Sequence, residues 1–357
     1  MLKQLLKQLR ERITPTDIVM WSIGAVMLAM IIWGSVATIS AGRYSRYHWF
    51  DFVIFGLAQG AIYALIAMGY TLVYGVLRMI NFAHSEVFMS GPYTAYYVAA
   101  AFYSSGFLDR HPILCLIAIF VVAMATSTLI AFLLERVAYR PLRNAPRLIP
   151  LITAIGASFF LQYVFRGLYG SGFQAYPVVK LLEGQITFGE YRILRIHLVV
   201  IVAAALLLVA LYSFIQRTRV GKAIRAVSED KEASYLMGID VDKMISTTFV
   251  IGGMAAGAAG VLYGLMFKQV HFFMGFIPGI KAFTAAVLGG IGNIPGAMLG
   301  GMFIGLFESI GPSLFLDGLG IKAPYQLKDA IAFTMLVLVL IFRPTGILGE
   351  RLAVKKA

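Results

Sequence analysis

Long apolar runs alternate with short polar segments along almost the whole chain. Crossing a bilayer takes about 20 mainly apolar residues in a helix, because every backbone polar group must be satisfied within the segment. A shorter run, 282–294, is interrupted by glycines, as expected for half a span. The pattern predicts an all-α, polytopic transmembrane helical bundle of nine or ten membrane segments, one of them broken or re-entrant. The long runs are 18–40, 52–77, 81–104, 112–135, 149–169, 196–215, 246–267, 297–316 and 327–342.

Composition and charge agree with a membrane protein. Of the 357 residues 60% are hydrophobic, and the mean hydropathy is +0.83, above the range of soluble domains. With a cytoplasmic N-terminus and ten alternating segments, 19 of the 30 Lys and Arg residues fall on the inner side. The positive-inside rule therefore accounts for the net charge of +13 and predicts that both termini are cytoplasmic. We expect membrane lipid, and no nucleic acid, around this chain.

The most polar segment, 216–243, stands between two apolar runs and reads QRTRVGKAIRAVSEDKEASYLMGIDVDK. Eleven of its residues are charged, whereas 13% of the whole chain is, so it forms a loop outside the bilayer. Within it, Asp230 is a suitable N-cap for a short helix from about Lys231 to Met237, which Gly238 would end. Composition alone leaves two interpretations open: a helix that seats in a groove of a partner protein, or a solvated connecting loop.

No pattern typical of an enzyme stands out. The chain has one cysteine, Cys115, so it forms no disulfide within itself, and no Cys/His metal-ligand spacing occurs. Gly221-Lys222 is followed by Ala223 and no glycine stands five positions earlier, so the phosphate-binding loop of an ATPase is missing. We predict no catalytic residue, no metal and no cofactor bound by this chain. If transport uses ATP, the nucleotide site lies on another polypeptide.

Polar residues inside apolar runs are candidates for a translocation pathway, because they are costly at membrane depth. The densest group is NFAHSE, which holds Asn81, His84, Ser85 and Glu86. On a helix the first three would share a face, being at i, i+3 and i+4. Two interpretations are equally supported. The group lines the pathway, or it marks a cytoplasmic helix end with Asn81 as N-cap and Glu86 near the positive end of the helix dipole.

Isolated polar residues occur in other apolar runs. Gln59, Gln162 and Thr284 are expected to hydrogen-bond across helix interfaces, which is the ordinary use of such residues. Glu308, as a buried carboxylate, is also a candidate for the translocation pathway, and so is Thr284. Glycines at four-residue spacing, such as Gly301 and Gly305, predict close packing of helices.

Two irregular segments are recognisable from glycine and proline. LGGIGNIPG, residues 288–296, would break any helix, and non-helical backbone at membrane depth is tolerated only against protein or a water-filled cavity. We therefore expect a broken helix there that lines the pathway, with Asn293 as a candidate residue. The stretch 170–195 is the largest loop on the outer side, and its glycines and alternating apolar residues predict a short hairpin.

Several blocks together carry a family resemblance. They are GLAQGAIYALIAMGYTLVYGVLRMINFAHSEVFMSG, AVSEDKEASYLMGIDVDK and KAFTAAVLGGIGNIPGAMLGG, with ERVAYRPLR and the terminal RPTGILG matching as well. Over about residues 50–350 the chain closely resembles the membrane-spanning permeases of branched-chain amino-acid ABC importers. Within each permease pair of such importers, it is similar to the LivH-type member.

The resemblance implies a subunit of an ATP-driven importer in the bacterial cytoplasmic membrane. Its partners would be a second, related permease, two cytoplasmic ATPases that use the ATP, and an extracytoplasmic solute-binding protein. Glu232, Ala233 and Gly238 stand where the permease docking loop has them, so residues 216–246, with Asp230, would form the coupling loop. Ser85 departs from the family pattern, because it stands where an NFAHGE-like run has glycine.

The resemblance also divides the chain. Residues 1–49 would be an N-terminal extension with an amphipathic start and one extra transmembrane helix, 50–350 the permease domain, and 351–357 a cytoplasmic tail. Two other functions stay open. A related permease could carry urea or short amides, and an ion-coupled secondary amino-acid transporter would use Glu86 and Glu308 as coupling groups.

Overall fold

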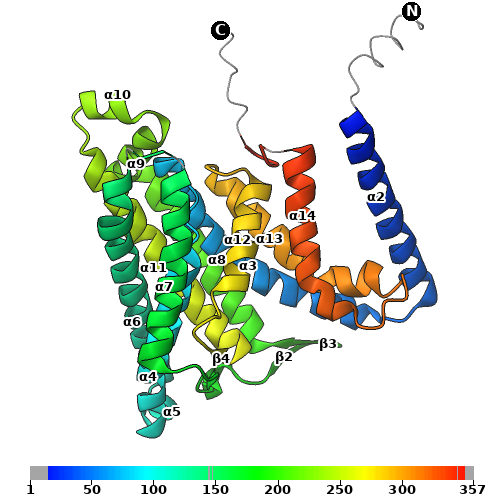
Figure 1. The fold of residues 1–357 in the computed structure, drawn as a ribbon. Coiled ribbons are helices and arrows are strands. Elements are labelled where there is room, and N and C mark those ends of the chain that lie inside the picture. Colours follow the sequence, from blue (N-terminus) through cyan, green and yellow to red (C-terminus); the bar gives the residue numbers. More distant parts are fainter. Residues whose placement is uncertain (1–14, 144, 147, 344, 350–357) are drawn as a thin grey trace, which may run out of the picture.

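The computed structural model describes residues 15–143, 145–146, 148–343 and 345–349, and within them long helices run between two faces of the molecule (Figure 1). Eight helical segments of this part are long and apolar enough to cross a membrane, which confirms the polytopic helical bundle. The long helices are α2 (Pro15–Ala41), α3 (Arg46–Leu77), α4 (His84–Ser104), α6 (Pro112–Leu133), α7 (Leu148–Tyr169), α8 (Arg195–Arg217), α11 (Val241–Phe267), α12 (Phe276–Gly289), α13 (Ile294–Gly311) and α14 (Lys328–Phe342).

Shorter elements join these helices. α6 continues through a π-helix and a 3-10 turn. Four short strands form two antiparallel pairs: β2 and β3 form a hairpin, whereas β1 and β4 are far apart in the sequence. The short elements are α5 (Phe107–Arg110), η1 (Leu134–Tyr139), η2 (Arg140–Leu142), β1 (Gln174–Ala175), η3 (Lys180–Leu182), β2 (Gln185–Phe188), β3 (Tyr191–Leu194), α9 (Arg219–Glu229), α10 (Lys231–Leu236), β4 (Gln269–Val270), η4 (Pro312–Leu316) and η5 (Pro324–Leu327).

Every predicted apolar run contains a helix, with shifts at the ends. α3 begins six residues before the predicted 52, and α4 begins at His84 rather than at 81. The turn before α4 has a structural cause: α3 ends at Arg78, whose left-handed φ of 56° stops the helix. The β2–β3 pair confirms the hairpin predicted within 170–195. The predicted amphipathic start and the tail 351–357 lie outside the described residues.

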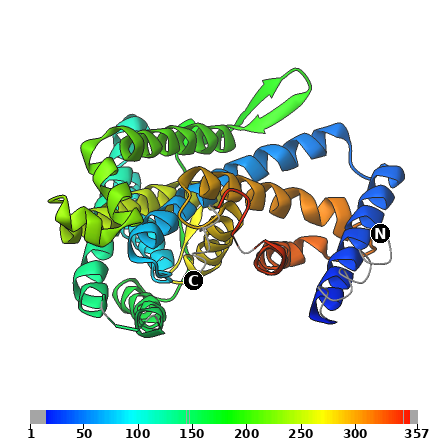
Figure 2. The same cartoon turned by 90° about the horizontal axis from the view of Figure 1, so that it is seen from above.

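The two faces of the molecule differ in what they carry. α9, α10, the start of α2 and the end of α14 lie at one face, which we call the α10 face (Figure 1). α5 and the strands lie at the opposite face, which we call the hairpin face (Figure 1). Seen from the α10 face, α2 stands at the end of the molecule remote from α6 and α7 (Figure 2).

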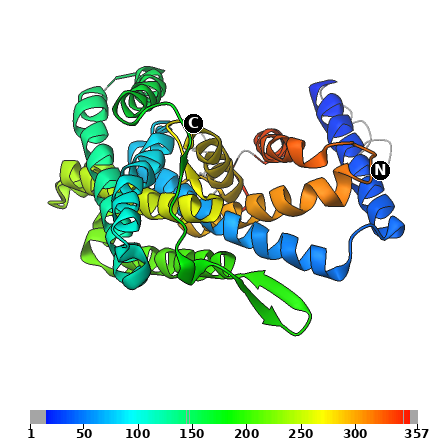
Figure 3. The ribbon, with the colours of Figure 1, turned by 90° about the horizontal axis from the view of Figure 1, so that it is seen from below.

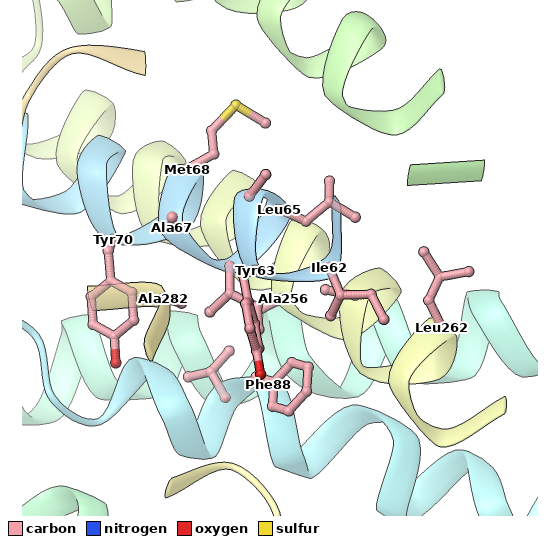
Figure 4. Close-up of a cluster of buried hydrophobic side chains, with 14 of the residues drawn as sticks. Ile62, Tyr63, Leu65, Ala67, Met68, Tyr70, Phe88, Ala256, Leu262 and Ala282 are labelled. Carbon is pink, nitrogen blue, oxygen red and sulfur yellow. The ribbon is translucent and has the colours of Figure 1, made fainter. Parts of the chain in front are cut away.

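The core is built around α3 and α11. α3 is buried on all sides over most of its length, from Gly56 to Val76, as expected for a helix that is apolar all round. Tyr63 and Tyr70 project from the same side of α3, and Met68 from another (Figure 4). All three side chains are at most 5% exposed, so α3 is the central helix of the bundle.

Glycines bring α3 and α13 into close contact. A methyl group added at Gly305 of α13 would lie 2.3 Å from the Cα of Gly60 in α3, and one at Gly301 would lie 2.5 Å from the Cα of Ala64. Gly253 and Gly257 of α11 approach α6 in the same way. Since water cannot drive helices together in lipid, this backbone contact supplies their packing, as the glycine spacing predicted.

The predicted helix break lies between α12 and α13. Gly290 and Gly292 have φ values of 105° and 97°, which favour glycine, and the Asn293 side chain caps α13 by accepting from the Gly296 N–H at 2.9 Å. The open carbonyls at the end of α12 are not left unpaired. The N–H groups of Ile347 and Leu348 donate to them at 2.8 and 3.0 Å, so the C-terminal segment completes this break.

Candidate functional site

A cluster of charged and polar side chains is buried where α3, α12, α13 and α14 meet. The carboxylate of Glu308 accepts hydrogen bonds from Gln59 Nε2 and Tyr63 Oη, each at 3.0 Å, and forms an ion pair with Lys281 Nζ at 2.5 Å. Lys281 Nζ also lies 2.6 Å from Asp329. The side chains of Lys281 and Glu308 are 3% and 1% exposed. Such burial is sustainable only because the charges are paired and hydrogen-bonded.

A cavity of about 580 Å³ opens beside this cluster at the hairpin face. It is lined by the first turns of α3, the β2–β3 hairpin, the start of α8, the end of α13 and the η5–α14 segment. Glu308 and Gln59 belong both to the cluster and to the wall of the cavity. This volume lies within the roughly 300–1,000 Å³ of small-molecule sites.

The NFAHSE group does not gather on one pathway. Asn81 lies before the helix, where its Oδ1 accepts from Tyr139 Oη at 2.6 Å, and Ala83 is the N-cap, so the interpretation of Asn81 as N-cap is wrong. His84 faces α3, with its Nε2 close to Gly69 and its ring 4.8 Å from that of Tyr70.

The next two residues point elsewhere. Ser85 packs against Gly275 and Gly279 at the start of α12. Glu86 faces α7, where its Oε1 accepts from Gln162 Nε2 at 2.8 Å and from Ser158 Oγ at 3.2 Å. The expected hydrogen bond of Gln162 across a helix interface is thus confirmed, as is that of Gln59.

Two further pathway candidates hydrogen-bond with backbone groups. Thr284 Oγ1 donates to the Ile280 carbonyl of its own helix at 2.9 Å, so its expected bond across an interface is not made. Asn293 Nδ2 donates to the Leu348 carbonyl at 2.9 Å in addition to capping α13. The translocation roles of these residues and of the NFAHSE group stay predictions.

The polar loop at the α10 face is ordered by helix caps. Asp230 Oδ1 accepts from the N–H groups of Glu232 and Ala233 at 2.9 and 3.0 Å, which confirms it as the N-cap of α10. Gly238, with a φ of 80°, ends the helix and donates to the Tyr235 carbonyl at 2.9 Å. The sequence-based helix was one residue too long, because Met237 is the C-cap.

α10 presents large apolar side chains to the outside. Tyr235, Leu236 and Met237 are 72%, 83% and 81% exposed. Desolvation, and after it the positive charges of Arg143 and Arg78, lower the pKa of Lys231. Those two arginines are the C-caps of η2 and α3.

Comparison with known proteins identifies the family. A family model described as "Branched-chain amino acid transport system / permease component" matches residues 52–340. The chain belongs to this permease family. α2, the first helix of the described residues, lies outside the matched range.

Individual relatives agree with the family match. The permease is 45% identical over 309 residues to the high-affinity branched-chain amino acid transport system permease protein BraD of Pseudomonas aeruginosa, covering 85% of this chain and 97% of BraD. It is 44% identical over 300 residues to LivH of Escherichia coli K12, covering 83% and 94%. A probable LivH of Methanocaldococcus jannaschii is 30% identical, with 80% and 88% covered. These relatives are permease subunits of branched-chain amino acid transport systems.

Sequence reasoning found Glu308 in this permease but missed its charged partners. Lys281 opens one of the blocks that carry the family resemblance, and a lysine between apolar segments was itself a signal of a buried ion pair. Asp329 stands just inside the last apolar run. No local pattern joined these three residues, because 21 or more positions separate each from the next along the chain.

Proposed function

We propose that this permease is one membrane-spanning subunit of an ATP-driven importer for branched-chain amino acids in the bacterial cytoplasmic membrane. A second, related permease completes the pathway, two ATPases bind and hydrolyse the ATP, and an extracytoplasmic solute-binding protein delivers the solute. α10 carries the proposal, because it is a short capped helix with exposed apolar side chains on a family member that is a transport component.

α10 is the proposed docking element for the ATPase. Large apolar side chains that project into water from a polar loop are typical of a surface that a partner covers. Tyr235, Leu236 and Met237 form such a surface, and Glu232 and Ala233, which the family resemblance assigns to the docking loop, lie in the same helix. The two caps keep this helix rigid, so a partner that binds it can move it as a unit.

The proposed docking fixes an orientation. Since ATP is in the cytoplasm, the α10 face is the cytoplasmic face and the hairpin face is outside. The start of α2 and the end of α14 lie at the α10 face, in agreement with two cytoplasmic termini (Figure 1). The excess of Lys and Arg expected on that side supports the same orientation.

Movement of α10 reaches the core through two connections. Asp230 ends α9 and begins α10, and Asp240 caps the following α11 by accepting from the Lys243 N–H at 3.0 Å. At the end of α3, Arg78 Nη2 donates to the Ser228 carbonyl of α9 at 2.6 Å. We propose that closure of the ATPases shifts α11 and α3 through these contacts and switches the cavity between sides.

The test is ATP-dependent uptake by the complete complex. The permease is purified with its co-expressed subunits and reconstituted in proteoliposomes, where accumulation of labelled leucine should require ATP. Leu236→Asp places a charge on the docking surface, and we expect it to abolish ATPase co-purification and uptake without affecting membrane insertion. Phe173→Asp is the control, because Phe173 is 69% exposed at the hairpin face.

Two results would overturn the proposal. Uptake that proceeds without any ATPase subunit and collapses with an ionophore would identify an ion-coupled transporter. Accumulation of urea or a short amide, with none of leucine, isoleucine or valine, would keep the ATP-driven mechanism and change the solute.

A further inference from the structure

The cavity at the hairpin face has a mixed-charge lining. Asp51 of α3, Arg192 of β3 and Lys328 of α14 all line it, together with Glu308 of α13. Glu308 is already compensated by Lys281, whereas Asp51 and Arg192 take part in no ion pair within the described residues. Lys328 Nζ lies 4.0 Å from Glu308, at the limit of an ion pair. The cavity thus offers one carboxylate and two cationic groups to a ligand.

The same cavity has an apolar wall. Phe52 and Phe55 of α3 line it together with Ile193 and Leu194 of β3, and Tyr325 adds a further ring 6.2 Å from that of Phe52. Removing an aliphatic side chain from water against such a wall is favourable. Charged groups of both signs and an apolar wall therefore occur in one space of about 580 Å³.

Aromatic contacts hold the hairpin over the cavity. The Tyr191 ring lies 5.4 Å from that of Tyr47 and 4.6 Å from that of Phe50, both in the first turns of α3. Figure 3, which looks onto the hairpin face, shows the β2–β3 hairpin beside that part of α3. Arg192 follows Tyr191 directly, so this packing fixes where its backbone enters the cavity wall.

We propose that this cavity binds the transported solute as a zwitterionic α-amino acid. Asp51 accepts hydrogen bonds from the α-ammonium group, Arg192 and Lys328 bind the α-carboxylate, and the phenyl rings of Phe52 and Phe55 contact the aliphatic side chain. The inference rests on the proposed function and adds the residues that recognise the solute. A zwitterion matches both signs of charge in the lining, whereas urea or a simple amide would leave them unmatched.

Protection of a cysteine from labelling tests the site directly. Leu194→Cys places a thiol in the cavity wall at a position where the native side chain is 42% exposed. The native Cys115 is fully buried and gives little background. The full-length permease, purified with its co-expressed subunits, is labelled with a water-soluble maleimide in the presence and absence of leucine. Ser171→Cys, exposed on the same face outside this cavity, is the control.

We expect leucine to slow labelling of the cavity thiol and to leave the control thiol unaffected. 3-Methylbutylamine lacks the carboxylate and 4-methylpentanoate lacks the ammonium group, so each should need about 10-fold or more higher concentration for half protection. Asp51→Asn and Arg192→Gln should each raise the leucine concentration for half protection by about 10-fold as well. Both native side chains are exposed, so these changes leave the fold intact.

Equal labelling with and without leucine would overturn the inference, and so would equal protection by leucine and both analogues. Either result combined with ATP-dependent leucine uptake would leave the proposed function standing. Protection of the cavity thiol without ATP-dependent uptake would support the site and refute the ATP-driven importer.

Discussion

Lys281 and Lys328 form a natural pair for testing the buried cluster, because both approach Glu308 and differ in burial. The side chain of Lys281 is 3% exposed and lies 2.5 Å from Glu308, whereas that of Lys328 is 41% exposed and 4.0 Å away. Lys281→Met leaves a carboxylate that is 1% exposed without its main counter-ion. Removing one partner of a buried pair costs about 3–5 kcal/mol of unfolding free energy.

The control and the double variant separate charge from packing. Lys328→Met removes a half-exposed lysine, and we expect a loss of at most about 1 kcal/mol. Lys281→Met combined with Glu308→Gln removes both buried charges, and we expect it to recover most of the loss, because replacing both members of a buried pair is often nearly neutral. With Glu308→Gln alone as the second single variant, the cycle should give a coupling energy of at least about 2 kcal/mol between Lys281 and Glu308.

The measurement is the unfolding free energy of the purified permease in mixed micelles, titrated with SDS and followed by loss of helical circular dichroism. The abundance of the native permease and of each variant in the membrane gives a second readout. If Lys281→Met and Lys328→Met were equally stable, or if the double variant lost the sum of the losses of Lys281→Met and Glu308→Gln, the cluster would not be an ion pair on which stability depends.

Two further substitutions test the packing and the docking helix. Gly305→Ala, which puts a methyl group 2.3 Å from the Gly60 Cα, should destabilise the permease by about 1–3 kcal/mol in the same SDS titration, whereas Gly156→Ala, with open space around it, should be neutral or slightly stabilising. Asp230→Ala removes the N-cap of α10 and should destabilise this helix by about 1 kcal/mol, seen as faster amide exchange over 231–236. Asp230→Asn keeps a capping side chain and serves as the control. Equal exchange rates in the two variants would contradict the capping role.

Local chemistry explains what could be predicted from the sequence. Helix caps and breaks depend on neighbouring residues, so Asp230 and Gly238 could be assigned to the ends of α10, and the glycines near Pro295 to a helix break. Apolar runs predicted the helices for the same reason, since spanning depends on length and composition. The observed helix ends differ from the predicted ones by several residues where a turn, such as that at Arg78, interrupts the apolar sequence.

Side-chain direction could not be predicted in the same way. Successive residues on an α-helix point about 100° apart, so His84, Ser85 and Glu86 face three different helices although they are adjacent in the sequence. Asn81 does not share the expected helix face with His84 and Ser85, because α4 begins after Asn81. The Lys281–Glu308 pair needed the packing of α12 against α13, which no local pattern encodes.

α3 is the element that joins the two ends of the proposed mechanism. It spans 32 residues, or about 48 Å at 1.5 Å per residue. Asp51 and Gln59 lie at its cavity end, while Arg78 holds α9 at the α10 face. Because Gly305 and Gly60 bring α13 into backbone contact with α3, we expect these two helices to move together. In the proposed mechanism, a displacement that enters through α9 therefore reaches Glu308 on α13 and Asp51 on α3 as one movement, and the β2–β3 hairpin follows it because Tyr191 packs on Tyr47 and Phe50 of α3.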